Sequence, residues 1–282
     1  MRDVIRKADI LVEALPYIQA FAGKTIVVKY GGSAMEDQSV VRGILQDLVF
    51  FSAVGLRPVL LHGGGPLISR RMASRGRSAT FIRGMRVTDC SMVRLVNTAL
   101  EEVNAQLVRH IRALGGRAVG LVARHQVIVA TPHRNARQLG FVGVVKTVRT
   151  DRIRQALNRE IIPIVSPIGS VNGQLYNINA DDVASAVAAS LHAEKLVLLT
   201  NVRGIFRPAG GSTSLVSTVS IRETQRLIRR KVIQQGMIPK VRACVAALKR
   251  GVKKTHIIDA NLPHALLLEI FTKQGIGTEI VR

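Results

Sequence analysis

The chain has 282 residues, a length that suits one large α/β domain or two lobes. Hydrophobic residues make up 47% of it, which is enough for a hydrophobic core and argues against disorder. Lys and Arg number 41 against 18 Asp and Glu, a formal net charge of +23. Aromatic residues make up only 4%, so the charge favours a generally basic surface first, an acidic protein partner second and nucleic acid a distant third.

Residues 1–20 are predicted to form an amphipathic helix, because apolar residues from Val4 to Leu15 recur at steps of three and four. Pro16 can bend or end that helix. Packing on its own domain is the default interpretation of this helix, and contact with another subunit is the alternative.

Short apolar runs then alternate with longer helical patterns. Most of the apolar runs lack polar positions, as is typical of strands covered on both faces, and their alternation with helices predicts a mostly parallel sheet between helix layers. A hairpin-like excursion is expected at 122–149, a flexible loop at 207–214 and a lobe boundary near residue 190. The expected strands are 25–30, 57–62, 117–122, 161–166, 195–200 and 255–258, and the expected helices are 38–54, 90–113, 180–192, 220–233 and 241–250.

The two cysteines and the absence of long apolar runs bear on the compartment. Cys90 and Cys244 have no CxxC spacing and no nearby His pair, so we expect buried small apolar residues in a reducing compartment. No apolar run approaches the ~20 residues that cross a bilayer, and the N-terminus lacks a signal-peptide core. The expected location is the cytoplasm, away from membranes.

Two lysines beside glycine-led turns are the strongest indication of function. Lys29 ends the apolar run 25–28 and precedes a glycine pair, and Lys240 closes GMIPK at 236–240. The run HGGGP at 62–66 follows another expected strand. Glycines after strands let the backbone approach a ligand, and the N–H groups that open the next helix favour anions. Two cations at such turns predict a site where a phosphoryl group is transferred.

Polar residues before the helix expected at 180–192 suggest a partner for these lysines. A buried lysine in an apolar strand needs a carboxylate, and Asp181 can orient two cations without chelating a metal. Helix capping alone is the simpler interpretation and suits Asp182 well. From its spacing alone, Arg86 is predicted to be one surface arginine among many. The alternative is that its guanidinium group binds a carboxylate through two parallel hydrogen bonds. GxxxxGK(S/T) is absent, as is GxGxxG after the first strand, which disfavours those two nucleotide-binding types.

Taken together, these motifs resemble the amino-acid kinase family and, within it, the arginine-sensitive N-acetylglutamate kinases. The resemblance implies a three-layer αβα sandwich with a mostly parallel central sheet. It also implies an oligomerisation helix at 1–20, a lobe at 21–190 for the amino-acid substrate and dimerisation, and a lobe at 191–282 for ATP and arginine. The likeness extends from about residue 15 to Arg282 and rests on KYGGSAM at 29–35, LHGGGP at 61–66, GMRVTD at 84–89, YNINADD at 176–182 and GMIPK at 236–240.

The resemblance implies ATP-dependent phosphorylation of the γ-carboxylate of N-acetyl-L-glutamate, in arginine biosynthesis. That carboxylate is already ionised, so cations and N–H donors, rather than a general base, would lower the barrier. ATP would bring Mg²⁺ on its phosphates, with no tightly bound metal. The implied catalytic residues are Lys29, Lys240 and Asp181, the substrate-binding residues are Gly63, Gly64, Arg86 and Asn177, and the nucleotide-binding residues are Gly31, Gly32, Thr200 and Asn201.

The same resemblance implies an arginine effector site lined by Tyr17, His256, Glu269 and Gly275, in which Glu269 pairs with the guanidinium group. A plain C-terminal strand and helix cap is the competing interpretation. Family members of this type form homodimers that the N-terminal helix joins into a homohexamer, and an acidic PII nitrogen-signalling protein is a further candidate partner.

Two other functions stay open. A sister kinase acting on aminoadipate or glutamate attached to an acidic carrier protein is favoured mildly by the charge and by Asn201, which stands where the family usually has an acidic residue. A basic non-catalytic paralogue, or a nucleic-acid-binding one, is favoured by the arginine-rich segment 69–86. Segment 122–126 and Arg242 also depart from the family pattern, but the lysine–aspartate set is intact, which favours activity.

Overall fold

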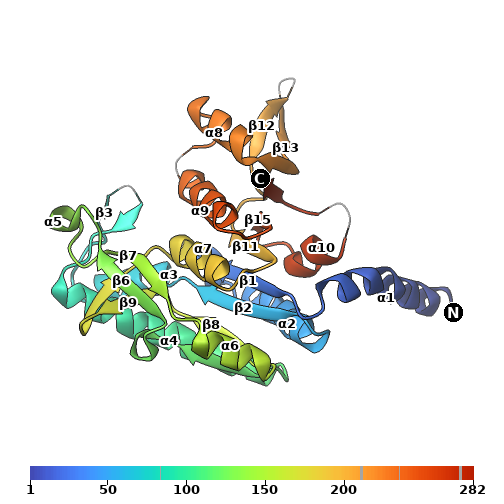
Figure 1. Ribbon diagram of the computed structural model, residues 1–282, viewed down its shortest axis with the longest axis horizontal. Coiled ribbons are helices and arrows are strands. Elements are labelled where there is room, and N and C mark those ends of the chain that lie inside the picture. Colours follow the sequence, from blue (N-terminus) through green and yellow to red (C-terminus); the bar gives the residue numbers. More distant parts are fainter. Residues whose placement is uncertain (83, 210–211, 235, 273–274) are drawn as a thin grey trace.

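The computed structural model describes residues 1–82, 84–209, 212–234, 236–272 and 275–282. An eight-stranded sheet lies at its centre (Figure 1). The order of its strands is β14-β16-β15-β11-β1-β2-β8-β5. Neighbouring strands are parallel except β15 and β16, which confirms the predicted mostly parallel sheet. These strands are β1 (Thr25–Tyr30), β2 (Arg57–His62), β5 (Ala118–Leu121), β8 (Ile162–Val165), β11 (Lys195–Thr200), β14 (Thr218–Ser220), β15 (Lys254–Asp259) and β16 (Thr278–Val281).

Helices cover both faces of this sheet, so the three-layer αβα sandwich is confirmed. Successive residues of a strand point to opposite faces, and β1 shows the result. Its Val28 belongs to the hydrophobic cluster beneath α2 (Gln38–Ala53), α4 (Cys90–Ala113) and α10 (Ala265–Phe271). Its Val27 belongs to the cluster formed with α6 (Asp151–Asn158), α7 (Ala180–Ser190), α8 (Ile221–Arg229) and α9 (Met237–Lys249). Lys29 therefore points to the α7 side.

Smaller elements surround the carboxyl ends of the strands. α3 (Gly65–Ala73) follows β2, η1 (Ser33–Glu36) follows β1, and β3 (Phe81–Ile82) pairs with β4 (Met85–Arg86). The excursion expected at 122–149 contains η2 (Ala123–His125) and α5 (Ala136–Leu139), and its strands join a second sheet. That sheet has the order β10 (Gln174–Asn177), β9 (Ile168–Val171), β6 (Ile128–Pro132) and β7 (Gly143–Val148), in which β6 and β7 form the expected antiparallel pair.

Two local expectations are wrong. The segment expected as a flexible loop pairs β12 (Phe206–Ala209) with β13 (Ser212–Leu215), while residues 210 and 211 lie outside the described residues. A two-stranded ribbon consists only of edge strands, so it tolerates Pro208. Cys90 is exposed, since it starts α4 directly after the N-cap residue Asp89, whereas Cys244 is buried as expected.

Helix α1 (Arg2–Phe21) extends away from the body of the molecule (Figure 1). Pro16 lies inside it without ending it. Ile5, Ile10, Val12 and Leu15 are exposed along this arm, so much of its apolar surface has no cover within the described chain. Among the described residues, no helix combines the length and the apolar character that crossing a lipid bilayer requires.

Candidate active site

One carboxylate joins two lysines at the carboxyl edge of the central sheet. The Nζ atom of Lys29 lies 2.9 Å from Oδ1 of Asp181, and the Nζ atom of Lys240 lies 3.0 Å from Oδ2. Lys29 comes from β1, Asp181 from the first turn of α7 and Lys240 from the first turn of α9. Asn179 fixes the start of α7 by accepting a 2.8 Å hydrogen bond from the Asp181 N–H. The structure thus brings the three predicted catalytic residues together.

Burial sets the electrostatics of this cluster. Lys29 is 7% exposed and Asp181 is 5% exposed. Burial lowers the pKa of Lys29, against the attraction of Asp181. Burial also acts to raise the pKa of Asp181, but the two neighbouring lysines hold it below its ordinary value. The carboxylate therefore stays ionised, and two protonated lysines that share it leave an excess of positive charge for an arriving anion.

Two glycine turns meet beside Lys29. A Cβ atom on Gly31 would lie 3.2 Å from the Cα atom of Gly63 and 3.2 Å from the Nζ atom of Lys29. The Gly63 N–H donates a 2.7 Å hydrogen bond to the carbonyl oxygen of Tyr30, which ties the turn after β2 to the end of β1. Gly32 has a φ of 86°, a conformation that favours glycine. Because glycine has no side chain, the backbone of both turns can lie close to Lys29.

A cavity of about 220 Å³ opens next to this cluster. Lys29 and Asp181 line it together with the four predicted substrate-binding residues, which are Gly63, Gly64, Arg86 and Asn177. Arg86 is 7% exposed, so spacing alone was misleading when it indicated a surface arginine. Its guanidinium carbon lies 4.7 Å from the centre of the Phe81 ring, and its Nη2 donates to Ser69 Oγ at 2.9 Å. This support leaves an oriented cation facing the cavity.

The residues predicted to bind the nucleotide lie at the same edge of the sheet. Gly31 and Gly32 follow β1, and Gly32 lines the cavity. Thr200 ends β11, the strand that pairs with β1 through Lys29 and Leu198, and Asn201 follows it on the surface. Thr200 and Asn201 lie outside the lining of the cavity, so their role in binding ATP remains a prediction.

A second polar cluster lies on the opposite face of the sheet, under α10. Nδ1 of His256 lies 2.6 Å from Oε1 of Glu269, whose Oε2 accepts a 2.7 Å hydrogen bond from the Ile276 N–H. A Cβ atom on Gly275 would lie 3.2 Å from that same Oε2. Tyr17 packs against the hydrophobic cluster that includes α10. Three of the four predicted effector residues therefore meet, and the fourth is on the neighbouring helix α1.

The sequence reasoning missed Lys195 in this second cluster. Its Nζ atom lies 3.3 Å from Nε2 of His256 and 5.1 Å from the centre of the Phe21 ring, at the end of α1. Lys195 is 8% exposed, and burial lowers its pKa. The sequence contains the pattern that would have indicated a buried Lys195, because this lysine begins an apolar strand just as Lys29 ends one.

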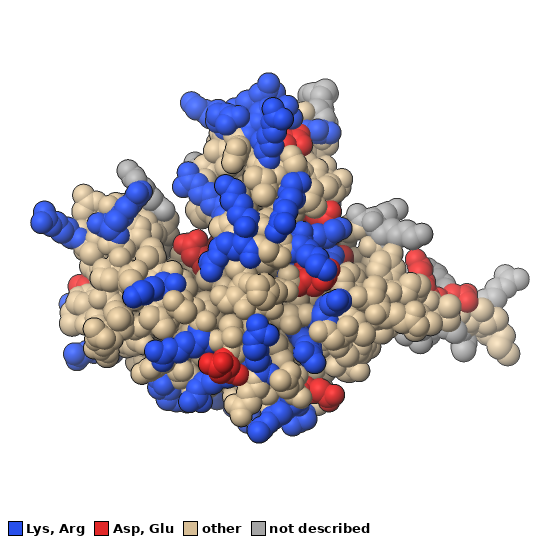
Figure 2. Space-filling view, viewed as in Figure 1, with Lys and Arg blue, Asp and Glu red and all other residues tan. Residues whose placement is uncertain are grey.

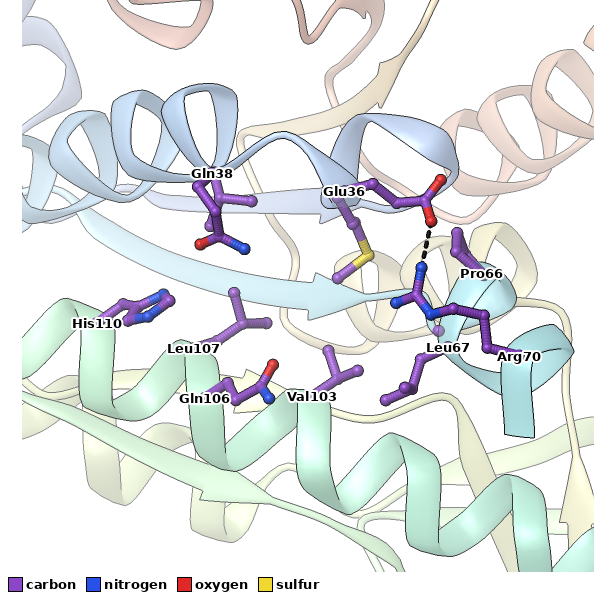
Figure 3. A pocket seen from close by; sticks show the side chains of 12 residues that line it. Glu36, Gln38, Pro66, Leu67, Arg70, Val103, Gln106, Leu107 and His110 are labelled. Carbon is purple, nitrogen blue, oxygen red and sulfur yellow. Dashed lines mark hydrogen bonds and ion pairs between the residues drawn. The ribbon is translucent and has the colours of Figure 1, made fainter. Parts of the chain in front are cut away.

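Another cavity, of about 280 Å³, is lined by residues of η1, α2, α3 and α4 (Figure 3), and Gly64 borders it as well as the cavity beside Lys29. Leu67, Val103 and Leu107 give it an apolar wall, and an ion pair between Arg70 and Glu36 lies at its edge (Figure 3). The lysine–aspartate cluster is not part of this lining. Figure 2 shows Lys and Arg spread across the visible face rather than gathered in one patch, as expected of a generally basic surface.

Comparison with known proteins gives one consistent result. The model of the amino acid kinase family matches residues 24–259. The acetylglutamate kinase of Desulforamulus reducens is 45% identical over 281 residues, covering 98% of each chain, and that of a Synechococcus species is 46% identical, covering 98% of this chain and 92% of the relative. Among solved structures, an N-acetylglutamate synthase from Neisseria gonorrhoeae complexed with coenzyme A and N-acetyl-glutamate superposes with a TM-score of 0.87 at 29% identity, covering 98% of this chain and 63% of that longer chain. A carbamate kinase from Giardia lamblia bound to AMP-PNP, at 17% identity and a TM-score of 0.70, shares the fold over 93% of this chain and 99% of its own.

Proposed function

Because the chain belongs to the amino acid kinase family, we propose that it transfers the γ-phosphoryl group of ATP to the γ-carboxylate of N-acetyl-L-glutamate, a step of arginine biosynthesis. The observation that carries this proposal is the position of Asp181 between Lys29 and Lys240, beside a cavity that also contains Arg86 and Asn177. The names of the full-length relatives supply the substrate.

In the proposed reaction, an oxygen of the substrate carboxylate attacks the γ-phosphorus, and the bond between that phosphorus and the β,γ-bridging oxygen breaks. The products are an acyl phosphate and ADP. Both reactants are anions, so the main obstacle is their mutual repulsion. Lys29 and Lys240 reduce it from two sides, while Asp181 holds their ammonium groups apart and in place before the reactants arrive.

Magnesium is proposed to arrive as part of the MgATP substrate. Mg²⁺ keeps several water ligands and commonly binds through substrate phosphates. The backbone N–H groups of the turns at 31–32 and 63–64 suit phosphate and carboxylate oxygens. Asp181 is occupied by two lysines at 2.9 and 3.0 Å, which leaves it poorly suited as a metal ligand.

Arg86 and Asn177 are proposed to hold the amino-acid substrate. Ser69 and the Gly65 carbonyl oxygen hold Nη2 of Arg86, and the remaining N–H groups of the guanidinium can donate to a substrate carboxylate. The Asn177 Nδ2 atom donates to Thr88 Oγ1 at 3.2 Å, which orients the amide, and its oxygen, which has no partner within the described residues, can accept from a substrate N–H. A free N-acetylated dicarboxylic amino acid satisfies both groups.

Regulation and assembly form the second part of the proposal. Glu269, on α10, meets His256, which in turn contacts Lys195, and a carboxylate anchored by backbone N–H groups suits the guanidinium group of free arginine. The exposed apolar residues of α1 support a homodimer that this helix joins into a homohexamer. The net charge of +23 supports docking of an acidic protein such as PII.

The test of the proposed reaction is acyl-phosphate formation, trapped with hydroxylamine, by the purified chain with MgATP. We expect rapid trapping with free N-acetylglutamate and little with a carrier-protein-bound substrate. Arg86→Lys should raise KM for N-acetylglutamate at least about tenfold and leave KM for ATP unchanged, because an ammonium group cannot keep the contacts with Ser69 and Phe81 that orient the cation. Arg75→Lys, an exposed position nearby, is the matched control. Preference for the carrier-bound substrate, or no product from either one, would overturn the assignment.

A further inference from the structure

His62 is a fully buried histidine directly before the glycine turn of the active site. It ends β2, is 0% exposed and lies outside the lining of the cavity beside Lys29. Its Nδ1 atom lies 2.8 Å from the carbonyl oxygen of Gly63. Its Nε2 atom lies 3.1 Å from the Nδ2 atom of Asn104, on α4. The imidazole is therefore held between the turn that it precedes and a helix on the α2 side of the sheet.

These two contacts define the tautomer of His62. The Gly63 carbonyl oxygen can only accept a hydrogen bond, so Nδ1 must carry the proton. Asn104 Nδ2 can only donate, and its orientation is fixed because the same atom donates to the Ile164 carbonyl oxygen at 2.8 Å. Nε2 of His62 is therefore the acceptor. Both contacts require a neutral ring with the proton on Nδ1.

The Gly63 carbonyl belongs to the same peptide unit as the Gly64 N–H. A trans peptide is planar, and its C=O and N–H bonds point in opposite directions. A hydrogen bond that holds the Gly63 oxygen toward His62 consequently turns the Gly64 N–H away from His62 and from helix α4. Gly63 and Gly64 both line the cavity that contains Lys29, and within the described residues the Gly64 N–H has no hydrogen-bond partner.

We propose that His62 is a positioning residue: neutral and protonated on Nδ1, it fixes the peptide between Gly63 and Gly64 so that the Gly64 N–H donates to an oxygen of the reacting anion. This inference rests on the proposed kinase reaction, because that reaction supplies the anion. His62 itself touches neither substrate and transfers no proton.

Asn104, on helix α4, holds the His62 ring from its Nε2 side. It is 2% exposed, and a Cβ atom on Gly120 would collide with its Oδ1 atom, so the glycine in β5 makes room for it. Neighbouring α4 residues, including Val103 and Leu107, line the cavity of Figure 3, which Gly64 also borders. Leu100, also on α4, would lie 2.7 Å from a Cβ atom on Gly64. Helix α4 thus supports the turn at two points.

Burial lowers the pKa of His62 to about 4, so the ring stays neutral near pH 7. An imidazolium ring would place a second proton on Nε2, facing the Asn104 donor. The site therefore favours the neutral ring that the two contacts require.

Two substitutions separate the two nitrogen atoms of the ring. His62→Asn keeps a donor near the Nδ1 position and loses the contact with Asn104, whereas His62→Gln keeps a polar atom near Nε2 and loses the donor to Gly63. We expect His62→Gln to lower kcat by about tenfold to hundredfold, as for a displaced oxyanion donor, and His62→Asn to retain most of kcat. KM for both substrates should change little. Equal activity of the two folded variants, or a loss confined to KM, would overturn the proposal.

Nitrogen-15 NMR of the histidines in the wild-type protein gives a readout that needs no activity. We expect the His62 signals, assigned by their absence in His62→Gln, to report a protonated Nδ1 and an unprotonated Nε2 between pH 6 and 8. A proton on Nε2 would refute the proposal even in an active kinase. An Nδ1 proton in a protein that forms no acyl phosphate would place the failure in the proposed reaction instead.

Discussion

The Nζ atom of Lys29 lies 2.9 Å from the Oδ1 atom of Asp181, and each of these side chains is 8% exposed. Removing one partner of a buried ion pair commonly destabilises a protein by about 3–5 kcal/mol, because a charge is left without its counterion. Substitution of Lys29 therefore mixes loss of stability with loss of catalysis, although Lys240 still pairs with Asp181. Lys240, whose side chain is 20% exposed, separates the two effects better.

Lys240→Met should lower kcat by about 10²–10³-fold, since it removes one of two charges aimed at the transferred group. The free energy of unfolding should change by less than about 1 kcal/mol, as for a partly exposed ion pair. Steady-state kinetics and urea unfolding measure the two quantities on the same preparation. Lys249→Met, on the exposed side of the same helix, is the control and should leave both unchanged. Similar kcat values for the two variants would remove Lys240 from the mechanism.

The close approach of the two glycine turns gives a second prediction. A methyl group at Gly31 would press on the Gly63 backbone and the Lys29 ammonium, each 3.2 Å away, so Gly31→Ala should lower kcat at least about tenfold. Gly43→Ala is the matched control, because Gly43 lies inside α2 with open space around its Cα atom. That substitution should stabilise the protein by about 0.5–1 kcal/mol and leave kcat unchanged. Equal kcat values for the two variants would show that the two turns can accommodate a methyl group at Gly31.

The fold and the lysine–aspartate cluster were predictable for physical reasons. Apolar runs that alternate with helical patterns indicate a parallel sheet, and parallel strands bring their carboxyl ends to one edge. Lys29 follows one such strand, and Asp181 opens a helix directly after an alternating polar segment. Lys240 was singled out by the glycine-led segment 236–240 that it closes, and its helix packs beside α7 although the two are distant in the sequence.

Contacts between separate elements were not predictable. The burial of Arg86 depends on Phe81 from β3 and Ser69 from α3, and no local pattern connects those positions. Lys195 meets His256 only because β11 pairs with β15. The pairing of β12 with β13 was hidden by a composition rich in Gly, Ser and Pro, which usually marks a loop.

The buried His62 gives a prediction about pH. Its pKa is lowered from 6.5 to about 4, so between these pH values the unfolded chain binds a proton that the folded chain does not. Its contribution to stability is complete above pH 6.5 and is lost as the pH falls toward 4. The free energy of unfolding of the wild-type protein should then fall by up to about 3 kcal/mol more than that of His62→Gln over this interval. Urea titrations at several pH values measure this difference, and parallel curves for the two proteins would show that His62 titrates normally.

The cluster under α10 gives a last prediction, about the proposed effector. Hydrogen bonds to charged groups are worth about 1.5–3 kcal/mol, so Glu269→Gln should raise the arginine concentration for half-inhibition at least about tenfold. The uninhibited kcat should stay within about twofold, because Glu269 and Lys29 lie on opposite faces of the sheet. Glu160→Gln, at an exposed position, is the control. Thermal melting supplies an independent readout, since arginine bound to the folded state should raise the Tm of the wild-type protein and of Glu160→Gln more than that of Glu269→Gln. Inhibition that persists unchanged in Glu269→Gln would place the effector elsewhere. If arginine neither inhibits nor stabilises the wild-type protein, the role of this cluster is purely structural, as a link between α10 and the sheet.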